Sequence, residues 1–351
     1  MTAIIPLDQT TAIAPTSAQA RAIVGTLANQ HAANATFADY RERKSTNTLR
    51  RHANDLQSFA SYLTHINTPA SADALLSGPD AWHGITWGMV AGYVQWLMND
   101  GFAVATVNAR LSTVKVYAKL ATQAGAIARE EYAMIQTVNG YQHKEVKHVD
   151  EKRSAAGIAT RKGVKKAESV MISPEQRRAL KDQPDTAQGR RDAVIMCLLL
   201  DHGLRCGELA TLQVTDVDLA AGVLRFYRPK VDKAQTHKLT GDSLRALRAW
   251  FDSGDAPIAG ALLRGSRKGG ELVDVGMSER AITKRVEYLG RRRGVVGLSA
   301  HDMRHSWATT AARRGTDPFR LKDAGGWTSM ATVDRYVSAA KIANDGVKLD
   351  E

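Results

Sequence analysis

The chain has 351 residues, 44% of them hydrophobic and 24% charged, which is long enough for two domains and typical of a globular protein. No apolar run reaches the roughly 18 residues that span a bilayer, and the N-terminus lacks the features of a signal peptide, so we expect a cytoplasmic protein with no membrane partner. With only two cysteines, the chain argues against a disulfide framework or a thiolate metal site.

The positive charge is concentrated in the second part of the chain. Residues 1–140 carry 10 Lys and Arg against 9 Asp and Glu, whereas residues 141–351 carry 38 against 27. A polyanion is the natural partner of such an excess, because each neutralised phosphate releases counterions, although a merely solvated basic surface has the same composition. Charge alone therefore favours nucleic acid as the partner of residues 141–351.

The first part of the chain has helical periodicity. Residues 1–35 are an N-terminal extension without a functional signal, although the stretch after Pro15 fits a helix that opens at a serine cap. Apolar residues then recur on one face of three further segments, residues 45–66, 86–101 and 105–125. We therefore predict a small all-helical domain over residues 36–140.

A basic linker is predicted over residues 141–171. The segment has few large apolar residues, an excess of Lys and Arg, and no sustained period, so we expect an extended conformation. It either tracks a phosphate backbone or is simply solvated. His143 and His148 are five residues apart, which is poor spacing for a metal site on one helical face.

Helical patterns return after the linker and are interrupted by one hairpin. Residues 190–212 predict a buried helix that stops at Gly203 and is followed by a second helix, and residues 222–240 change to strand character. Further helices are expected at 241–253, 278–292, 302–314, 317–324 and 330–350. Residues 172–351 therefore predict a mostly helical domain with one small sheet.

Several charged and aromatic residues in this domain, at particular spacings, suggest phosphate chemistry. Arg205 and Glu208, and likewise His301 and Arg304, are three residues apart and share a helical face. The hairpin carries Lys230 and Lys233, and a tryptophan and a tyrosine follow near the C-terminus, at positions 327 and 336. Taken singly, each is more typical of a surface ion pair, a core tryptophan or an amphipathic surface tyrosine.

Other catalytic signatures are absent from the sequence. There is no Walker loop, no His/Cys cluster and no acidic trio, and Asp216 and Asp218 have the spacing of turn and cap residues. Phosphoryl chemistry without a metal must stabilise the transition state with fixed cations, a task suited to the planar, permanently charged guanidinium group. Two arginines and a lysine would supply these fixed cations.

Together these residues resemble the tyrosine recombinase, or phage integrase, family. The motifs are "GLRCGEL", a lysine on a hairpin, "HDMRH", "GGW" where most members carry Gly-His, and a tyrosine in "VDRYV" nine residues later. The resemblance implies a mainly α fold, a two-domain DNA clamp. A helical SAM-like core-binding domain over residues 36–140 would precede a mostly helical catalytic domain with a small antiparallel sheet over residues 172–351.

The resemblance also implies a set of catalytic residues. They are Arg205, Glu208, Lys230, His301, Arg304, Trp327 and Tyr336. Tyr336 would attack a DNA phosphate to give a 3′-phosphotyrosyl link, the two arginines would clamp the non-bridging oxygens, and Lys230, in preference to Lys233, would protonate the departing 5′-oxygen.

The remaining implied roles support this reaction. His301 would manage the tyrosine proton or bond the phosphate, Trp327 would pack under the site and donate its indole N–H, and Glu208 would hold its neighbours. His305 is expected to make a structural hydrogen bond, whereas Arg313 and Arg314 fit the C-terminal end of a helix. No cofactor, metal or ATP is expected.

The implied function is site-specific DNA recombination. Four copies of the chain would assemble on two duplex sites with inverted-repeat arms and exchange strands through a Holliday junction, with the tail after Tyr336 packing onto a neighbouring copy. The alternatives are a type IB topoisomerase, a DNA-binding protein that never cleaves, and a metal-dependent transposase. The sequence does not identify the DNA site or the biological role.

Overall fold

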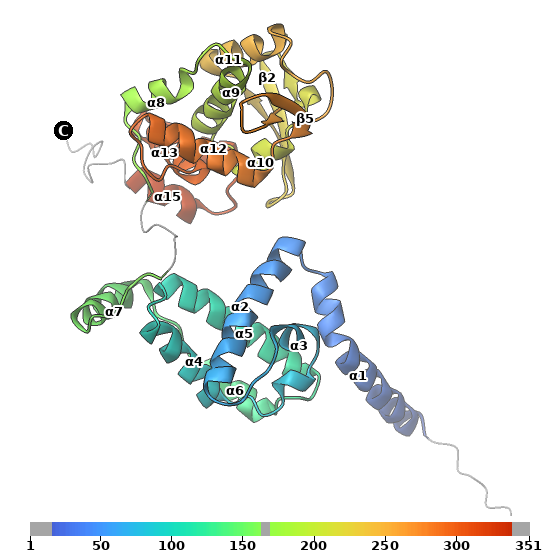
Figure 1. The fold of residues 1–351 in the computed structure, drawn as a ribbon. Coiled ribbons are helices and arrows are strands. Elements are labelled where there is room, and N and C mark those ends of the chain that lie inside the picture. Colours follow the sequence, from blue (N-terminus) through green and yellow to red (C-terminus); the bar gives the residue numbers. More distant parts are fainter. Residues whose placement is uncertain (1–15, 163–168, 339–351) are drawn as a thin grey trace, which may run out of the picture. The chain divides into compact units, whose positions relative to one another are not determined.

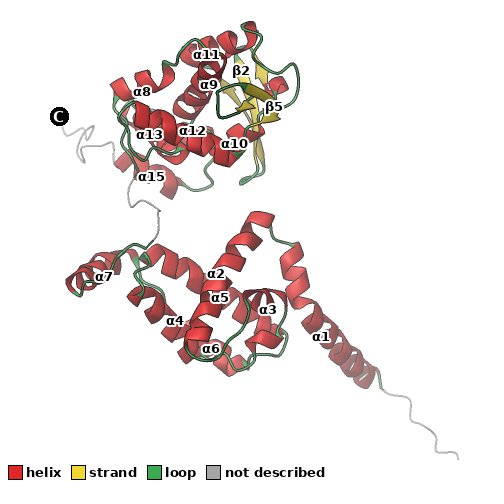
Figure 2. Ribbon diagram, in the orientation of Figure 1, coloured by secondary structure: helices red, strands yellow, loops and turns green. Residues whose placement is uncertain are grey.

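The structure is a computed structural model that describes residues 16–162 and 169–338, and it divides into two compact units, Met1–Lys165 and Lys166–Glu351. Both units are built mainly of helices, and the described strands lie in the second unit (Figures 1 and 2). The predicted mainly α fold is therefore confirmed. Among the described residues, no helix is long and apolar enough to cross a membrane.

The first unit is an all-helical domain. Its helices are α1 (Ser17–Glu42), α2 (Thr46–His65), α3 (Ala72–Ser77), α4 (Trp87–Asn99), α5 (Val104–Gln123), α6 (Arg129–Thr137) and α7 (His143–Ala155), with a short helical turn at Asp80–Trp82. The helix predicted after Pro15 is α1, but the expected serine cap is wrong, because Ser17 is its first residue and the N-cap is Thr16. The Thr16 hydroxyl accepts the backbone N–H of Gln19 at 3.3 Å. Because α1 extends to Glu42, it crosses the boundary expected at residue 36.

Aromatic side chains form the centre of the first core. Trp82 is fully buried, stacks against Phe59 at a centroid distance of 5.9 Å, and donates its indole N–H to the Leu75 carbonyl at 2.9 Å. The indole N–H is thus satisfied while the ring fills the space between α2 and α5. The helical periodicity read from the sequence reports this core correctly.

The extended linker predicted over residues 141–171 is wrong for the segment that forms α7. Two valines of α7 pack against the first core. Arg153, only 6% exposed, donates to the backbone carbonyls of Phe102 and Ala159 at 3.0 and 2.7 Å. This helix therefore depends on tertiary hydrogen bonds, which a local apolar period does not report.

The second unit is built around one buried helix, α9. Its helices are α8 (Pro174–Lys181), α9 (Ala187–His202), α10 (Cys206–Thr211), α11 (Gly241–Asp252), α12 (Glu279–Arg292), α13 (Ala300–Arg313), α14 (Pro318–Gly325) and α15 (Met330–Ser338), with a short helical turn at Val214–Asp216. Helix α9 packs against α8, α11 and α13, and its residues Leu198, Leu199 and Leu200 are fully buried. The helices predicted here are confirmed as far as residue 338, and the expected continuation to residue 350 and the tail lie outside the described residues.

The predicted hairpin is the centre of a three-stranded antiparallel sheet. Strand β2 (Val223–Arg228) lies between β1 (Val217–Asp218) and β3 (Lys233–Lys238), and the β2–β3 register runs from Val223 opposite Lys238 to Arg228 opposite Lys233. Asp216 and Asp218 accept the backbone N–H groups of Gln213 and Ala221, as expected of turn and cap residues. A second, two-stranded sheet, β4 (Arg264–Ser266) with β5 (Leu272–Gly276), was not predicted because both strands are short.

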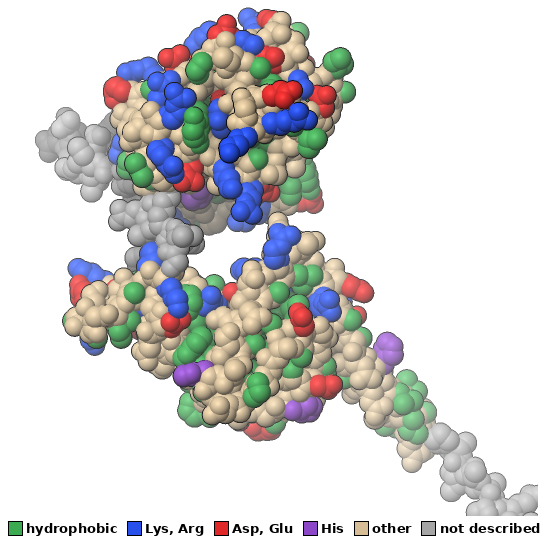
Figure 3. Space-filling view, in the orientation of Figure 1, with side chains coloured by type: hydrophobic (Ala, Val, Ile, Leu, Met, Phe, Trp, Pro, Cys, Tyr) green, Lys and Arg blue, Asp and Glu red, His purple; other side chains and the backbone are tan. Residues whose placement is uncertain are grey.

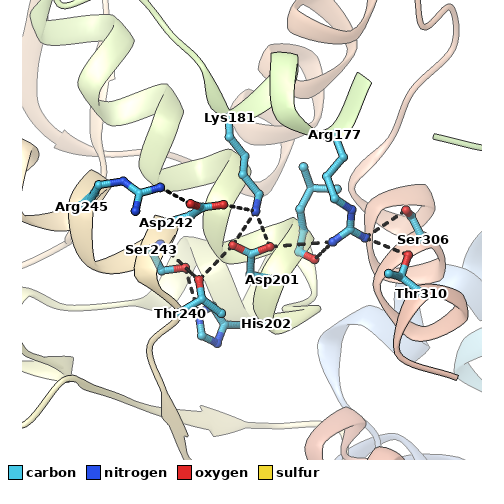
Figure 4. Close-up of polar contacts among 11 residues, drawn as sticks. Arg177, Lys181, Asp201, His202, Thr240, Asp242, Ser243, Arg245, Ser306 and Thr310 are labelled. Carbon is cyan, nitrogen blue, oxygen red and sulfur yellow. Dashed lines mark hydrogen bonds and ion pairs between the residues drawn. The ribbon is translucent and has the colours of Figure 1, made fainter. Parts of the chain in front are cut away.

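A polar network ties α13 to the buried helix (Figure 4). The Lys181 ammonium bonds the Asp201 carboxylate at 2.5 and 2.7 Å and the Asp242 carboxylate at 2.8 Å. Beside it, the Arg177 guanidinium donates to the Leu200 carbonyl of α9 at 2.9 Å and to two hydroxyl groups of α13 at 3.2 and 3.3 Å. Helix α13, which carries His301 and Arg304, is thereby fixed in orientation against α9.

Candidate active site

The first arginine of the motif stands at a sharp turn between two helices. Helix α9 ends at Gly203, which has φ +60°, and a Cβ atom there would meet the Trp307 ring at 2.3 Å. Arg205 is the N-cap residue of α10, and its Nη1 lies 2.5 Å from Oε1 of Glu208, whose Oε2 accepts the Arg205 backbone N–H at 2.8 Å. Because Glu208 is 3% exposed, the pairing expected from the spacing is a partly buried clamp that orients Arg205.

The second arginine is more deeply placed. Arg304 is 4% exposed, donates to the backbone carbonyls of Gly203 and Gly325, and stacks over the Trp327 ring with 4.8 Å between its Cζ and the ring centroid. Burial, and then the positive charges of Arg205 and Arg228, lower the pKa of Arg304 to about 9. A guanidinium group in such surroundings gains stabilisation from an incoming anion.

The tyrosine lies beside this cluster. Tyr336 is 7% exposed, and its ring lies 5.3 Å from Trp327 and 4.9 Å from His305, the latter in an edge contact. Burial raises the pKa of Tyr336, while the nearby charge of Arg304 opposes the rise. The phenol is therefore neutral near pH 7.

The two residues expected to transfer protons differ from the buried residues of this cluster. His301 and Lys230 are exposed, and the described residues give neither a hydrogen bond nor an ion pair. Lys233 differs, because its ammonium lies 3.7 Å from the Asp323 carboxylate. The structure thus brings together Arg205, Glu208, Arg304, Trp327 and Tyr336, and it shows no contact from Lys230 or His301 to these five.

Two residues near the site were missed or misjudged. The hydrogen bond expected of His305 is not present among the described residues, where its ring instead contacts Tyr336. Arg228 was not singled out, although it is fully buried and bonds Glu208 at 2.7 Å. The one available signal was the alternation of β2, which puts Arg228 on the same inward face as Leu224 and Phe226.

Basic side chains also gather on the surface of the second unit. Figure 3 shows Lys and Arg side chains over the region of α10 and α12. Helix α12 alone contributes Arg280, Lys284, Arg291 and Arg292, which are all exposed. Exposed Lys and Arg side chains of this kind are suited to the sequence-independent attraction of phosphate backbones.

A neutral buried tyrosine beside two guanidinium groups is suited to phosphoryl transfer onto the tyrosine oxygen, which defines a class of DNA strand transferases. Residues 171–342 match the model of the phage integrase family. The chain is 25% identical over 311 residues to the tyrosine recombinase XerC of Mycobacterium leprae (strain TN), covering 86% of this chain and 93% of that protein. The XerC of Azotobacter vinelandii is 30% identical over 185 residues, covering 52% of this chain and 60% of its own length. Residues 171–342 therefore belong to the phage integrase family, and along most of its length the chain is similar to tyrosine recombinases.

Solved structures show the same fold. A lambda integrase dimer bound to a COC′ core site matches with a TM-score of 0.56 at 13% identity, covering 95% of this chain and 87% of that one. The Tn1549 transposon integrase in complex with a circular intermediate DNA matches with a TM-score of 0.55 at 16% identity, covering 80% and 94%. The "GGW" motif, with Trp327 in place of the usual histidine, also resembles that of Cre recombinase, and this finer likeness stays a prediction.

Proposed function

We propose that this chain is a site-specific DNA recombinase that cuts and rejoins strands through a covalent link between Tyr336 and a 3′-phosphate. The observation that carries the proposal is the convergence of Arg205, Arg304 and Trp327 on Tyr336, a buried phenol within electrostatic reach of both guanidinium groups. The bond that breaks is the phosphorus–O5′ bond, and its energy is kept in the phosphotyrosyl link. Rejoining therefore needs no ATP.

The charges in the site suit each step of this transfer. The Tyr336 oxygen attacks phosphorus as its proton leaves, and His301 is our candidate acceptor for that proton. Arg205 and Arg304 bond the non-bridging oxygens, where charge grows in the transition state. Lys230 gives a proton to the departing 5′-oxygen, which is otherwise a poor leaving group. Trp327 holds the tyrosine and the Arg304 guanidinium in place by packing.

The partner we propose is double-stranded DNA. Structures similar to this chain include DNA complexes, among them XerH bound to a difH substrate. By analogy, this chain would act on two sites with inverted-repeat arms as a homotetramer and pass through a Holliday junction. The cytoplasmic location and the absence of a cofactor or metal requirement are likewise proposals, and activity in EDTA would test the latter.

Two other functions remain as candidates. A type IB topoisomerase would use the same chemistry to relax supercoiled plasmid without partner sites, and a non-catalytic protein would bind DNA without forming an adduct. The helical first unit favours the recombinase, because recombinases of this family carry such a core-binding domain.

Adduct formation on a selected duplex tests the proposal. Duplexes bound by the full-length chain are enriched from a random-sequence pool, and a nicked version traps the cleaved state. The wild type should shift to a covalent protein–DNA band on a denaturing gel with EDTA present. Tyr336→Phe should bind with wild-type affinity and form no band, since only the attacking oxygen is lost. A normal band from Tyr336→Phe contradicts the proposal.

A further inference from the structure

Arg228 is the best-connected buried cation at the site, yet no step of the proposed reaction uses it. It is the last residue of β2, fully buried, and two positions before Lys230. Its guanidinium donates to acceptors on three other elements: Oε2 of Glu208 in α10 at 2.7 Å, Oε1 of Gln235 in β3 at 2.5 Å, and the Ala324 carbonyl in α14 at 2.8 Å. A buried guanidinium is costly to desolvate, so each of these bonds matters.

Each acceptor leads to a different part of the site. Glu208 uses its other oxygen to hold Arg205 at 2.5 Å. Ala324 directly precedes Gly325, whose carbonyl accepts a hydrogen bond from Arg304. Gln235 stands across the hairpin and donates to the Asp323 carbonyl at 2.6 Å, so both strands grip the end of α14.

Close packing around the Arg228 side chain adds to these hydrogen bonds. Gly326 caps α14 with φ +57°, and a Cβ atom there would lie 2.5 Å from Cδ of Arg228. The Arg228 guanidinium also lies over the Phe226 ring, 4.8 Å from its centroid. The side chain is therefore held in one position.

We propose that Arg228 is a positioning residue that keeps Glu208 ionised and thereby fixes Arg205, while anchoring the base of the Lys230 hairpin to the segment that leads into Trp327. Being fully buried, Arg228 does not touch the phosphate and is not itself catalytic. This inference rests on the proposed recombinase function and concerns how the same site is held.

The charges around Glu208 give the proposal a specific signature. The groups that face Glu208 are Arg205 on α10, Arg228 on β2, Arg304 on α13 and His237 on β3. Burial by itself would raise the pKa of Glu208, but the Arg205 backbone N–H and the charges of Arg228 and Arg205 outweigh it, so the pKa is lowered. Without Arg228 the pKa of Glu208 rises, and protonation then releases Arg205 as the pH falls.

Three variants and one matched control test this signature. Arg228→Met removes the positive charge, and Arg228→Lys keeps the charge but loses the planar set of guanidinium donors. The double variant Glu208→Gln/Arg228→Met also removes the carboxylate whose pKa is expected to change. Arg225→Met is the control, because Arg225 lies on the same strand but is exposed, and among the described residues its ion-pair partner is Asp218 at 3.3 Å. The readout is the single-turnover rate of adduct formation on the nicked selected duplex between about pH 5.5 and 8.5, with DNA affinity measured in parallel.

The expected results separate positioning from folding. Arg228→Met should be slower by on the order of tenfold to a hundredfold at neutral pH, as for a misplaced catalytic group, and should lose further rate on the acid side relative to wild type. DNA affinity should stay unchanged. The extra acid-side loss should be absent in Arg228→Lys and in the double variant, and Arg225→Met should match the wild type.

Two outcomes overturn the inference: a wild-type rate and pH profile in Arg228→Met, or an acid-side loss that persists in the double variant. If Arg228→Met does not fold, Arg228→Lys and the double variant decide by the same criterion. Thermal unfolding against pH repeats the comparison without DNA, so the link between Arg228 and the Glu208 charge is tested even if the wild type forms no adduct. If the wild type forms no adduct, that result counts against the recombinase function and not against the positioning role of Arg228.

Discussion

Replacing Lys230 by alanine separates proton donation from charge stabilisation. Lys230 is exposed and without a described partner, so its loss should change the free energy of unfolding by no more than about 0.5 kcal/mol. Loss of a general acid slows the chemical step by roughly a hundredfold to ten-thousandfold. On ordinary DNA we therefore expect Lys230→Ala to form adduct slower by that factor while folding and binding normally.

A sulfur substrate identifies the missing step. In a 5′-bridging phosphorothiolate the leaving sulfur needs no proton, so Lys230→Ala should recover most of its rate. Arg304→Ala should recover much less, because that change removes charge stabilisation at the non-bridging oxygens. The assay is single-turnover cleavage on both substrates, in parallel with the wild type.

Lys233→Ala is the matched control. It breaks an ion pair of 3.7 Å between side chains that are 55% and 80% exposed, worth at most about 1 kcal/mol, and should cleave like the wild type. Sulfur rescue of Lys233→Ala in place of Lys230→Ala would move the acid three positions along the hairpin. Rescue of neither would leave His301 as the next candidate.

Further expectations concern stability, salt and assembly. Gly326→Ala should destabilise the fold by roughly 2–4 kcal/mol in chemical denaturation, because alanine disfavours φ +57° and its Cβ would lie 2.5 Å from Cδ of Arg228; an unchanged midpoint would refute this packing. Burial lowers the pKa of both His202 and His237 to about 4, so stability should be complete above about pH 6.5 and fall toward pH 4, and His202→Asn should reduce that fall in a thermal melt. DNA affinity should drop on the order of a thousandfold between roughly 50 and 200 mM salt if six or more phosphates are contacted, whereas a flat response would contradict the charge asymmetry. Deleting residues 340–351 should spare single-site binding and impair synapsis, as seen in a two-site gel-shift assay.

Periodicity and end signals sufficed to predict most helices of both units. The serine before α2 and the glycine after α9 are visible in the sequence and act in the structure as a cap and a left-handed stop. The spacing of Arg205 and Glu208 likewise predicts their contact, which forms because Arg205 is the N-cap of α10 and Glu208 is the third residue of that helix. These signals are local, so the sequence carries them directly.

Long-range contacts are what the sequence does not report. Helix α7 depends on Arg153, whose acceptors include a carbonyl 51 residues away. Arg228 bonds a glutamate 20 residues earlier and a carbonyl 96 residues later, and an arginine beside two lysines on a hairpin is indistinguishable from solvated charge until the fold is known. Buried cations of this kind are identified by their partners, which only the tertiary structure supplies.

The balance of charge at the site explains why it is poised for a phosphate. Arg205, Arg228 and Arg304 surround one carboxylate, Glu208, so three positive charges meet one negative charge. The pKa of Arg304 is lowered first by burial and then by the charges of Arg205 and Arg228. Because the guanidinium groups are held by carbonyls and by Glu208 before substrate arrives, little reorganisation is needed when negative charge develops on the phosphate. Tyr336 experiences the same excess, since Arg304 and Arg205 both favour its ionised form against the opposing effect of burial. In the reaction we propose, this one arrangement of arginines would attract the phosphate, stabilise its transition state and lower the cost of deprotonating Tyr336.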